Sequence, residues 1–177
     1  MTYALQMATT RRHNSLIGEM YLALTYLLKT RTYEAMHEEQ ALVYYGKLYD
    51  ICTLVDINSI NKEDVVSFQD KTIDTLAFVQ PDFMLFKKGS YLLNPSETKV
   101  AGIPELIVEV WSLANRQEER TLKKKLYSSA NTEHWYITQD SNLVECCFGE
   151  RSIGNQSLTE VLKTTRGVEL DLRYLAL

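Results

Sequence analysis

The sequence predicts a mixed α/β domain in which helices cover a central β-sheet. The very apolar segment 104–112 (PELIVEVWS) is typical of a central strand. A helix is predicted directly after it at 115–130 (NRQEERTLKKKLYSSA), and further strands follow that helix. A strand, a helix and a strand in succession favour a sheet with helices on its faces. The 177 residues suit one core, so we expect residues 1–177 to form a single domain.

The other elements follow from the spacing of apolar residues. A helix is predicted over 11–29, because apolar residues recur there at three- and four-residue steps. Apolar and β-branched residues predict strands within 41–57 and at 76–86 (LAFVQPDFMLF), with a connecting loop at 87–102. Towards the C-terminus we expect two strands joined by the turn QDSN, then a short helix and a last strand, at 134–140, 143–149, 157–165 and 168–172 respectively.

Composition excludes several classes of protein. The net charge of −4 argues against a protein that coats nucleic acid through bulk charge, although 116–125 is locally basic. No apolar run approaches the roughly 20 residues that cross a bilayer, so we expect no membrane association. The start of the chain lacks the pattern of a secretory signal, and the three cysteines include an adjacent pair. These features favour a reduced, cytoplasmic protein.

Two acidic residues stand beside or inside strongly apolar strands. In LIVEV, side chains alternate between faces, so Glu109 points the same way as Ile107 and Trp111. Both faces are apolar, and an unpaired carboxylate there would cost several kcal/mol. Asp82 likewise precedes the apolar run FMLF. A shared divalent cation would satisfy both acids, because Mg²⁺ prefers oxygen ligands and takes one or two carboxylates plus waters.

Each acid also has a simpler interpretation. Glu109 could lie half-exposed near the end of its strand, or pair with a Lys or Arg, since structural ion pairs are common. Asp82 could follow Pro81 into a turn. The pattern of residues alone leaves these alternatives open.

The helix after the central strand is rich in lysine. Glu119, Lys123 and Tyr127 are spaced i, i+4 and i+8, and therefore share one face. A lysine beside the sheet could orient a metal-bound water or stabilise charge in a phosphoryl transition state. The alternative is a solvated helix face, which suits Lys124 and Lys125.

Together these segments resemble the Uma-type endonucleases, a branch of the PD-(D/E)XK nuclease superfamily. The resemblance covers residues 11–148 and implies a restriction-endonuclease-like fold, a mixed sheet flanked by helices. Individually the motifs are short, and their order and spacing carry the resemblance. They are a His-led helix (RRHNSLIGEMYLAL), QPD, PELIVEVWS, Lys123 four residues before Tyr127, and the strands NTEHWYITQD and LVECCFG.

The resemblance implies roles for particular residues. Asp82 matches the Asp of the superfamily motif and Glu109 the second acid, which together hold Mg²⁺ or Mn²⁺. In our leading hypothesis the backbone carbonyl of Val110 is a further ligand. The superfamily keeps a Lys two residues beyond the Glu, where this chain has Trp111. Family members carry that Lys on the next helix, a position that Lys123 matches. Asp82, Glu109 and Lys123 are therefore the candidate catalytic residues.

The leading hypothesis is a metal-dependent endonuclease that hydrolyses phosphodiester bonds of nucleic acid, with DNA as the expected substrate. A homodimer is expected because nucleases that cut both strands often pair. Two alternatives stay open. The first is a catalytically silent nuclease-fold module that binds nucleic acid or protein, and the second is a hydrolase of another phosphate ester.

Overall fold

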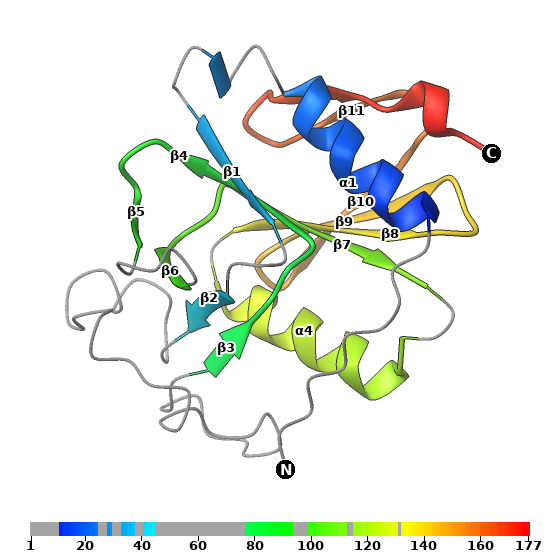
Figure 1. Ribbon diagram of the computed structural model, residues 1–177. Coiled ribbons are helices and arrows are strands. Elements are labelled where there is room, and N and C mark those ends of the chain that lie inside the picture. Colours follow the sequence, from blue (N-terminus) through cyan, green and yellow to red (C-terminus); the bar gives the residue numbers. More distant parts are fainter. Residues whose placement is uncertain are drawn as a thin grey trace.

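The predicted fold class is confirmed by the computed structural model, a mixed α/β arrangement with a six-stranded mixed sheet flanked by two helices (Figure 1). The structure describes residues 11–24, 28–29, 33–37, 41–44, 77–93, 99–112, 115–130 and 132–177. The helices are α1 (Arg11–Ala23) and α4 (Gln117–Ser129), with a 3₁₀ turn η3 (Arg173–Leu175) near the C-terminus.

The main sheet has the strand order β1-β4-β7-β8-β9-β10. Only β7 and β8 run parallel within it, because α4 connects them as a crossover helix, and the other neighbours are antiparallel. The predicted central strand is β7, which lies third in the order and is buried along its whole length. The strands are β1 (Tyr33–His37), β4 (Phe83–Lys87), β7 (Leu106–Trp111), β8 (Glu133–Thr138), β9 (Leu143–Phe148) and β10 (Arg151–Ser157).

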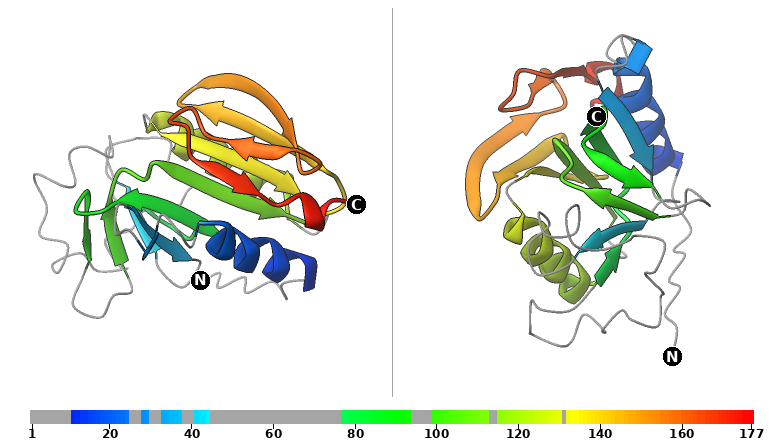
Figure 2. Two further views of the ribbon diagram at one scale, coloured as in Figure 1. Left: turned by 90° about the horizontal axis from the view of Figure 1, so that it is seen from above. Right: turned by 90° about the vertical axis from the view of Figure 1, so that its left-hand side faces the viewer.

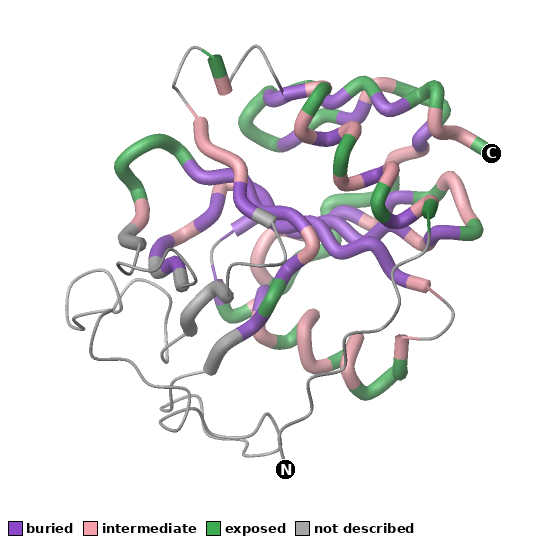
Figure 3. Tube along the Cα trace, viewed as in Figure 1, coloured by how far each residue is buried: buried purple, intermediate pink, exposed green. Residues whose placement is uncertain are grey.

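The alternation along β7 divides the core into two layers, as the sequence predicts. Leu106, Val108 and Val110 pack beside α1 and the C-terminal hairpin, which is β11 (Val161–Lys163) and β12 (Glu169–Asp171). Ile107 and Trp111 pack on the opposite face with α4. Figure 2 shows α1 and α4 on opposite sides of the sheet, and Figure 3 shows the buried residues concentrated in its central strands.

A second, four-stranded sheet corrects two of the expectations. Segment 76–86 does not form one strand, because Pro81 cannot donate to a ladder and the chain divides there into β3 and β4. Segment 87–102 is not only a loop but also contains β5 and β6. The order of this sheet is β3-β2-β6-β5, from β3 (Ala77–Val79), β2 (Ala41–Tyr44), β6 (Lys99–Gly102) and β5 (Tyr91–Leu93).

The C-terminal region differs from its prediction. The short helix expected at 157–165 is wrong, because this segment ends β10, turns and forms β11 against β12. The hairpin of β8 and β9 and the last strand, β12, are confirmed. Of the strand region predicted within 41–57, only β2 falls among the described residues. Within the described part of the chain, no helix has the length and apolar character needed to span a membrane.

Candidate active site

Asp82 and Glu109 lie where the ladder between β4 and β7 ends. The last pair of this antiparallel ladder is Phe83 with Val108, so Asp82 and Glu109 are the next residues on the two strands. Beyond this pair the backbone of β7 finds a side-chain partner, because the Val110 N–H donates to Asp82 Oδ2 at 2.6 Å. The Asp82 carboxylate thus accepts a hydrogen bond from the residue that follows Glu109.

The second oxygen of Asp82 contacts the first turn of α1. His13 Nε2 lies 3.1 Å from Asp82 Oδ1, and both side chains are largely buried. His13 Nδ1 lies 3.3 Å from Asn14 Oδ1. Asp82 is therefore held from two sides, by β7 and by α1, and its carboxylate has a fixed orientation.

Glu109 is almost completely buried, with 1% of its surface exposed, and two side chains of α4 contact it. Lys123 Nζ lies 2.8 Å from Glu109 Oε2, and the Tyr127 hydroxyl donates to Oε1. Lys123 and Tyr127 are one helical turn apart and share a face of α4, as their spacing predicts. Lys123 Nζ also donates to the Gln80 carbonyl at 3.3 Å, so its ammonium group bridges β7 and the segment that leads to Asp82.

Burial and neighbouring charges shift the pKa values of both Glu109 and Lys123. Burial raises the pKa of Glu109 to about 7, and the charge of Asp82 adds to the rise, while Lys123 and Tyr127 oppose it. Burial lowers the pKa of Lys123, but the charges of Glu109 and Asp82 outweigh this, so that its pKa lies above the ordinary value. Lys123 consequently keeps its proton at neutral pH.

The oxygen atoms at this point suit a hard divalent cation. In a β-strand the N–H and C=O of one residue point to the same edge. The carbonyl of Val110 therefore faces the side of Asp82, which accepts the Val110 N–H. Two carboxylates and a backbone carbonyl are the kind of ligands that Mg²⁺ takes, together with waters and substrate phosphates. No group of three or more His, Cys, Asp or Glu side chains in the described ranges is arranged to hold a metal.

The structure thus brings Asp82, Glu109, Val110 and Lys123 together at one end of the β4–β7 pair. Trp111, which lies on the same face of β7 as Ile107 and Glu109, is a buried core residue. Sequence reasoning did not identify the contact between His13 and Asp82. The available signal was the position of His13 at the start of an amphipathic helix, which is compatible with many local roles.

One solved structure shares this arrangement of helices and strands. It is the "crystal structure of a putative nuclease belonging to DUF820 from Anabaena variabilis ATCC 29413". The match has a TM-score of 0.63 and 12% sequence identity, and it covers 97% of this chain and 85% of that chain. At this identity the likeness shows a common fold. No protein-family model matches the sequence, and no curated protein does so either.

Proposed function

We propose that this protein is a Mg²⁺-dependent nuclease that hydrolyses phosphodiester bonds of nucleic acid. The observation that carries the proposal is the meeting of Asp82 and Glu109 at the end of one ladder, with the Lys123 ammonium group on the buried carboxylate. The fold neighbour, whose title describes a nuclease, supports the same reading.

Asp82 and Glu109 would hold the cation, with the carbonyl of Val110 as a third protein ligand. Bound there, Mg²⁺ would polarise the phosphate and lower the pKa of a water molecule. His13 and the Val110 N–H keep Asp82 in one orientation, so the site is organised before substrate arrives. Mn²⁺ has a similar preference for oxygen ligands and is expected to substitute.

Lys123 supplies a fixed positive charge. Because its pKa is raised, it acts as a cation that orients water or stabilises charge on the phosphate, and not as a base. In the reaction, a water oxygen attacks phosphorus and its proton passes to solvent, the bond to the leaving sugar oxygen breaks, and that oxygen takes up a proton from solvent. The side chain of Lys123 is 18% exposed, so it lies at the edge of the site, where a substrate phosphate would bind.

The direct experiment measures cleavage of DNA, RNA and a small phosphate ester in Mg²⁺, in Mn²⁺ and with a chelator. We expect metal-dependent cleavage of nucleic acid that is lost in Glu109→Gln and in Lys123→Met. Glu118→Gln is the matched control, because Glu118 is an exposed acid of the same helix. Metal-dependent cleavage that survives Glu109→Gln would contradict the proposal, and preference for the small ester would favour a different hydrolase.

A binding module without catalysis is the second candidate function. It is favoured by the fact that Asp82 and Glu109 already have protein partners, so neither carboxylate depends on a cation for a favourable contact. Salt-sensitive binding of DNA, without cleavage in any metal, would support this candidate.

A further inference from the structure

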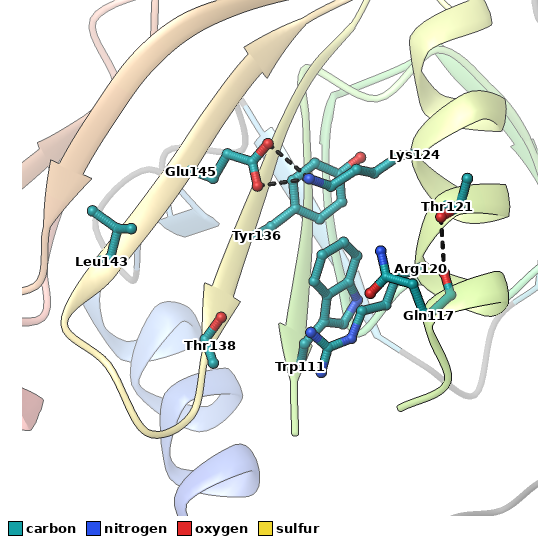
Figure 4. A pocket seen from close by; sticks show the side chains of 9 residues that line it. All are labelled: Trp111, Gln117, Arg120, Thr121, Lys124, Tyr136, Thr138, Leu143 and Glu145. Atoms are coloured by element: carbon teal, nitrogen blue, oxygen red, sulfur yellow. Dashed lines mark hydrogen bonds and ion pairs between the residues drawn. The ribbon is translucent and has the colours of Figure 1, made fainter. Parts of the chain in front are cut away.

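A pocket of about 240 Å³ opens next to the candidate active site, between α4 and the strands β8 and β9 (Figure 4). Residues of α4 form one wall, and Thr138, Leu143 and Glu145 lie opposite them. The α4 wall consists of Gln117, Arg120, Thr121 and Lys124, and the rings of Trp111 and Tyr136 complete the lining. The pocket is lined by described residues throughout.

The aromatic rings of this pocket have two cations above them. Trp111 and Tyr136 stack with ring centroids 4.5 Å apart and an interplanar angle of 29°. The Arg120 guanidinium lies 5.1 Å from the Trp111 ring, and Lys124 Nζ lies 4.7 Å from the Tyr136 ring. Lys124 reaches across to Glu145, with which it pairs at 2.6 Å. The two rings are almost completely buried, at 6% and 2% exposed, so the pocket presents mainly the polar and charged groups of Arg120, Lys124 and their neighbours.

Arg120 has hydrogen-bonding capacity left over. One terminal nitrogen donates to the Ser112 carbonyl, which fixes the guanidinium at the pocket. Its Nε is buried and lacks a hydrogen-bond partner among the described residues. A guanidinium carries five N–H donors in a planar arrangement that matches phosphate oxygens. Because Nε is buried, an oxyanion in the pocket would be met by the terminal nitrogens of the guanidinium.

The position of the pocket connects it to the candidate active site. Trp111 follows Glu109 by two residues on the same face of β7, so the two side chains stand roughly 7 Å apart along the strand. Lys124 likewise follows Lys123 on α4, and the two ammonium groups contact different acids, Glu145 and Glu109. A nucleic-acid strand with one phosphate bound beside Glu109 would bring its adjoining nucleotide to the pocket.

We propose that this pocket binds one nucleotide of a single strand, next to the phosphate that is cleaved. Its phosphate would contact Arg120 and Lys124, and its base would lie in the space between α4 and the side chains of Thr138 and Leu143. The inference rests on the proposed function for its choice of ligand. It adds that the preferred substrate is a single strand, a frayed end or a flap, and not an intact duplex.

Size and geometry support a single unpaired nucleotide. The volume lies below the roughly 300–1,000 Å³ typical of pockets for drug-sized ligands, so the pocket can enclose part of one nucleotide and cannot take a base pair. A base inside a duplex is stacked and paired, and it reaches a concave pocket only after it leaves the stack. The bases of a single strand are unpaired and do not pay this cost.

The test measures binding with a chelator present, so that it does not depend on cleavage. A labelled eight-residue oligodeoxythymidine and a duplex of equal length are titrated with wild-type protein, Arg120→Gln, Gln117→Glu and Lys125→Gln. The last is the matched control, because Lys125 lies on α4 outside the pocket and its loss changes the net charge by the same amount. Gln117→Glu is a near-isosteric change at an exposed position in the first turn of α4, where an acid is compatible with the helix, so it tests the pocket even if Arg120→Gln fails to fold.

We expect the single strand to bind at least about tenfold more tightly than the duplex, and Arg120→Gln and Gln117→Glu to weaken it about tenfold. Lys125→Gln should stay within about twofold. Tryptophan emission should change with the same midpoint, because Trp111 lines the pocket while Trp135, the other tryptophan, is fully buried in the opposite layer. Equal affinity for the duplex, equal effects of the pocket and control variants, or unchanged emission would overturn the inference. Absence of cleavage in Mg²⁺ would instead count against the proposed function alone.

Discussion

Two glutamates on neighbouring strands, Glu109 of β7 and Glu133 of β8, are equally buried and have opposite surroundings. Each is 1% exposed. Glu133 accepts hydrogen bonds from Trp135 Nε1, from the Thr165 N–H and from the Thr165 hydroxyl, at 2.6–2.7 Å. Glu109 has Lys123 and Tyr127 as partners, and both of these side chains are titratable.

The difference indicates that the Glu133 carboxylate stabilises the fold, whereas the Glu109 carboxylate is available for chemistry. The partners of Glu133 are uncharged, and Thr165 belongs to the C-terminal hairpin region, so the bonds tie that region to the sheet. Glu109 faces α4 instead, beside a second carboxylate and a lysine, and burial raises its pKa to about 7. A buried carboxyl group whose ionisation is unfavourable and whose partners are themselves ionisable is typical of a functional site.

Replacement of each glutamate by glutamine should give the largest contrast, and it concerns activity. Glu109→Gln removes a proposed metal ligand and should lower the rate of cleavage about a thousandfold or more, which corresponds to about 4 kcal/mol. Glu133→Gln should cleave at nearly the wild-type rate per folded molecule, because Glu133 lies on the other face of the sheet from α4. Single-turnover rates in Mg²⁺ measure both effects, and equal losses in the two variants would break the comparison.

Truncation of Glu133 should have the largest effect on stability. Glu133→Ala leaves the Trp135 Nε1–H and two donors of Thr165 without their acceptor, which should lower the free energy of unfolding by about 3 kcal/mol. Urea titrations with and without the substitution measure this loss. A decrease below about 1 kcal/mol would show that water replaces the carboxylate and that Glu133 does not fasten the hairpin.

Sequence reasoning identified one of these glutamates and missed the other for physical reasons. Glu109 stands in the middle of LIVEV, where the alternation of apolar residues exposes the anomaly directly. Glu133 begins its strand after polar residues, so it resembles an ordinary strand end. Its partner Thr165 lies 32 residues further along the chain, in a segment whose predicted helix proved to be a turn and a strand.

The strands of the fold also divide into those that the sequence predicts and those that it does not. The strands that are buried on both faces, such as β7 and β8, were predictable because their composition is set by burial. The edge strand β10 has the sequence RSIGNQS and is mostly exposed, so it carries little apolar signal. Its formation depends on pairing with β9 across a two-residue turn, a contact that the apolar pattern of the strand itself does not indicate.

The pH dependence of stability sharpens the comparison further. The pKa of Glu109 rises from 4.5 to about 7 in the folded protein, so between these values the native state binds more protons than the unfolded state. The free energy of unfolding should therefore fall as the pH rises from about 4.5 to 7, by up to about 3 kcal/mol. This contribution is absent in Glu109→Gln. Denaturant titrations with a chelator at several pH values should show the wild-type stability falling relative to that of Glu109→Gln between about pH 4.5 and 7, with a constant difference between the two above pH 7. Curves that stay parallel would contradict the assigned shift.

The smallest expected effects come from single hydroxyl groups, and they test whether the partners of the two carboxylates differ in kind. Tyr127→Phe and Thr165→Val each remove one hydroxyl donor, and each should cost about 1 kcal/mol of stability. Only Tyr127→Phe acts on a titrating carboxylate. Because the Tyr127 hydrogen bond lowers the pKa of Glu109, its loss should raise that pKa and move the pH-dependent fall in stability to higher pH. Thr165→Val should leave the position of that fall unchanged. If the two variants displaced it equally, the charge state of Glu109 would depend on the whole fold and not on its contacts with α4.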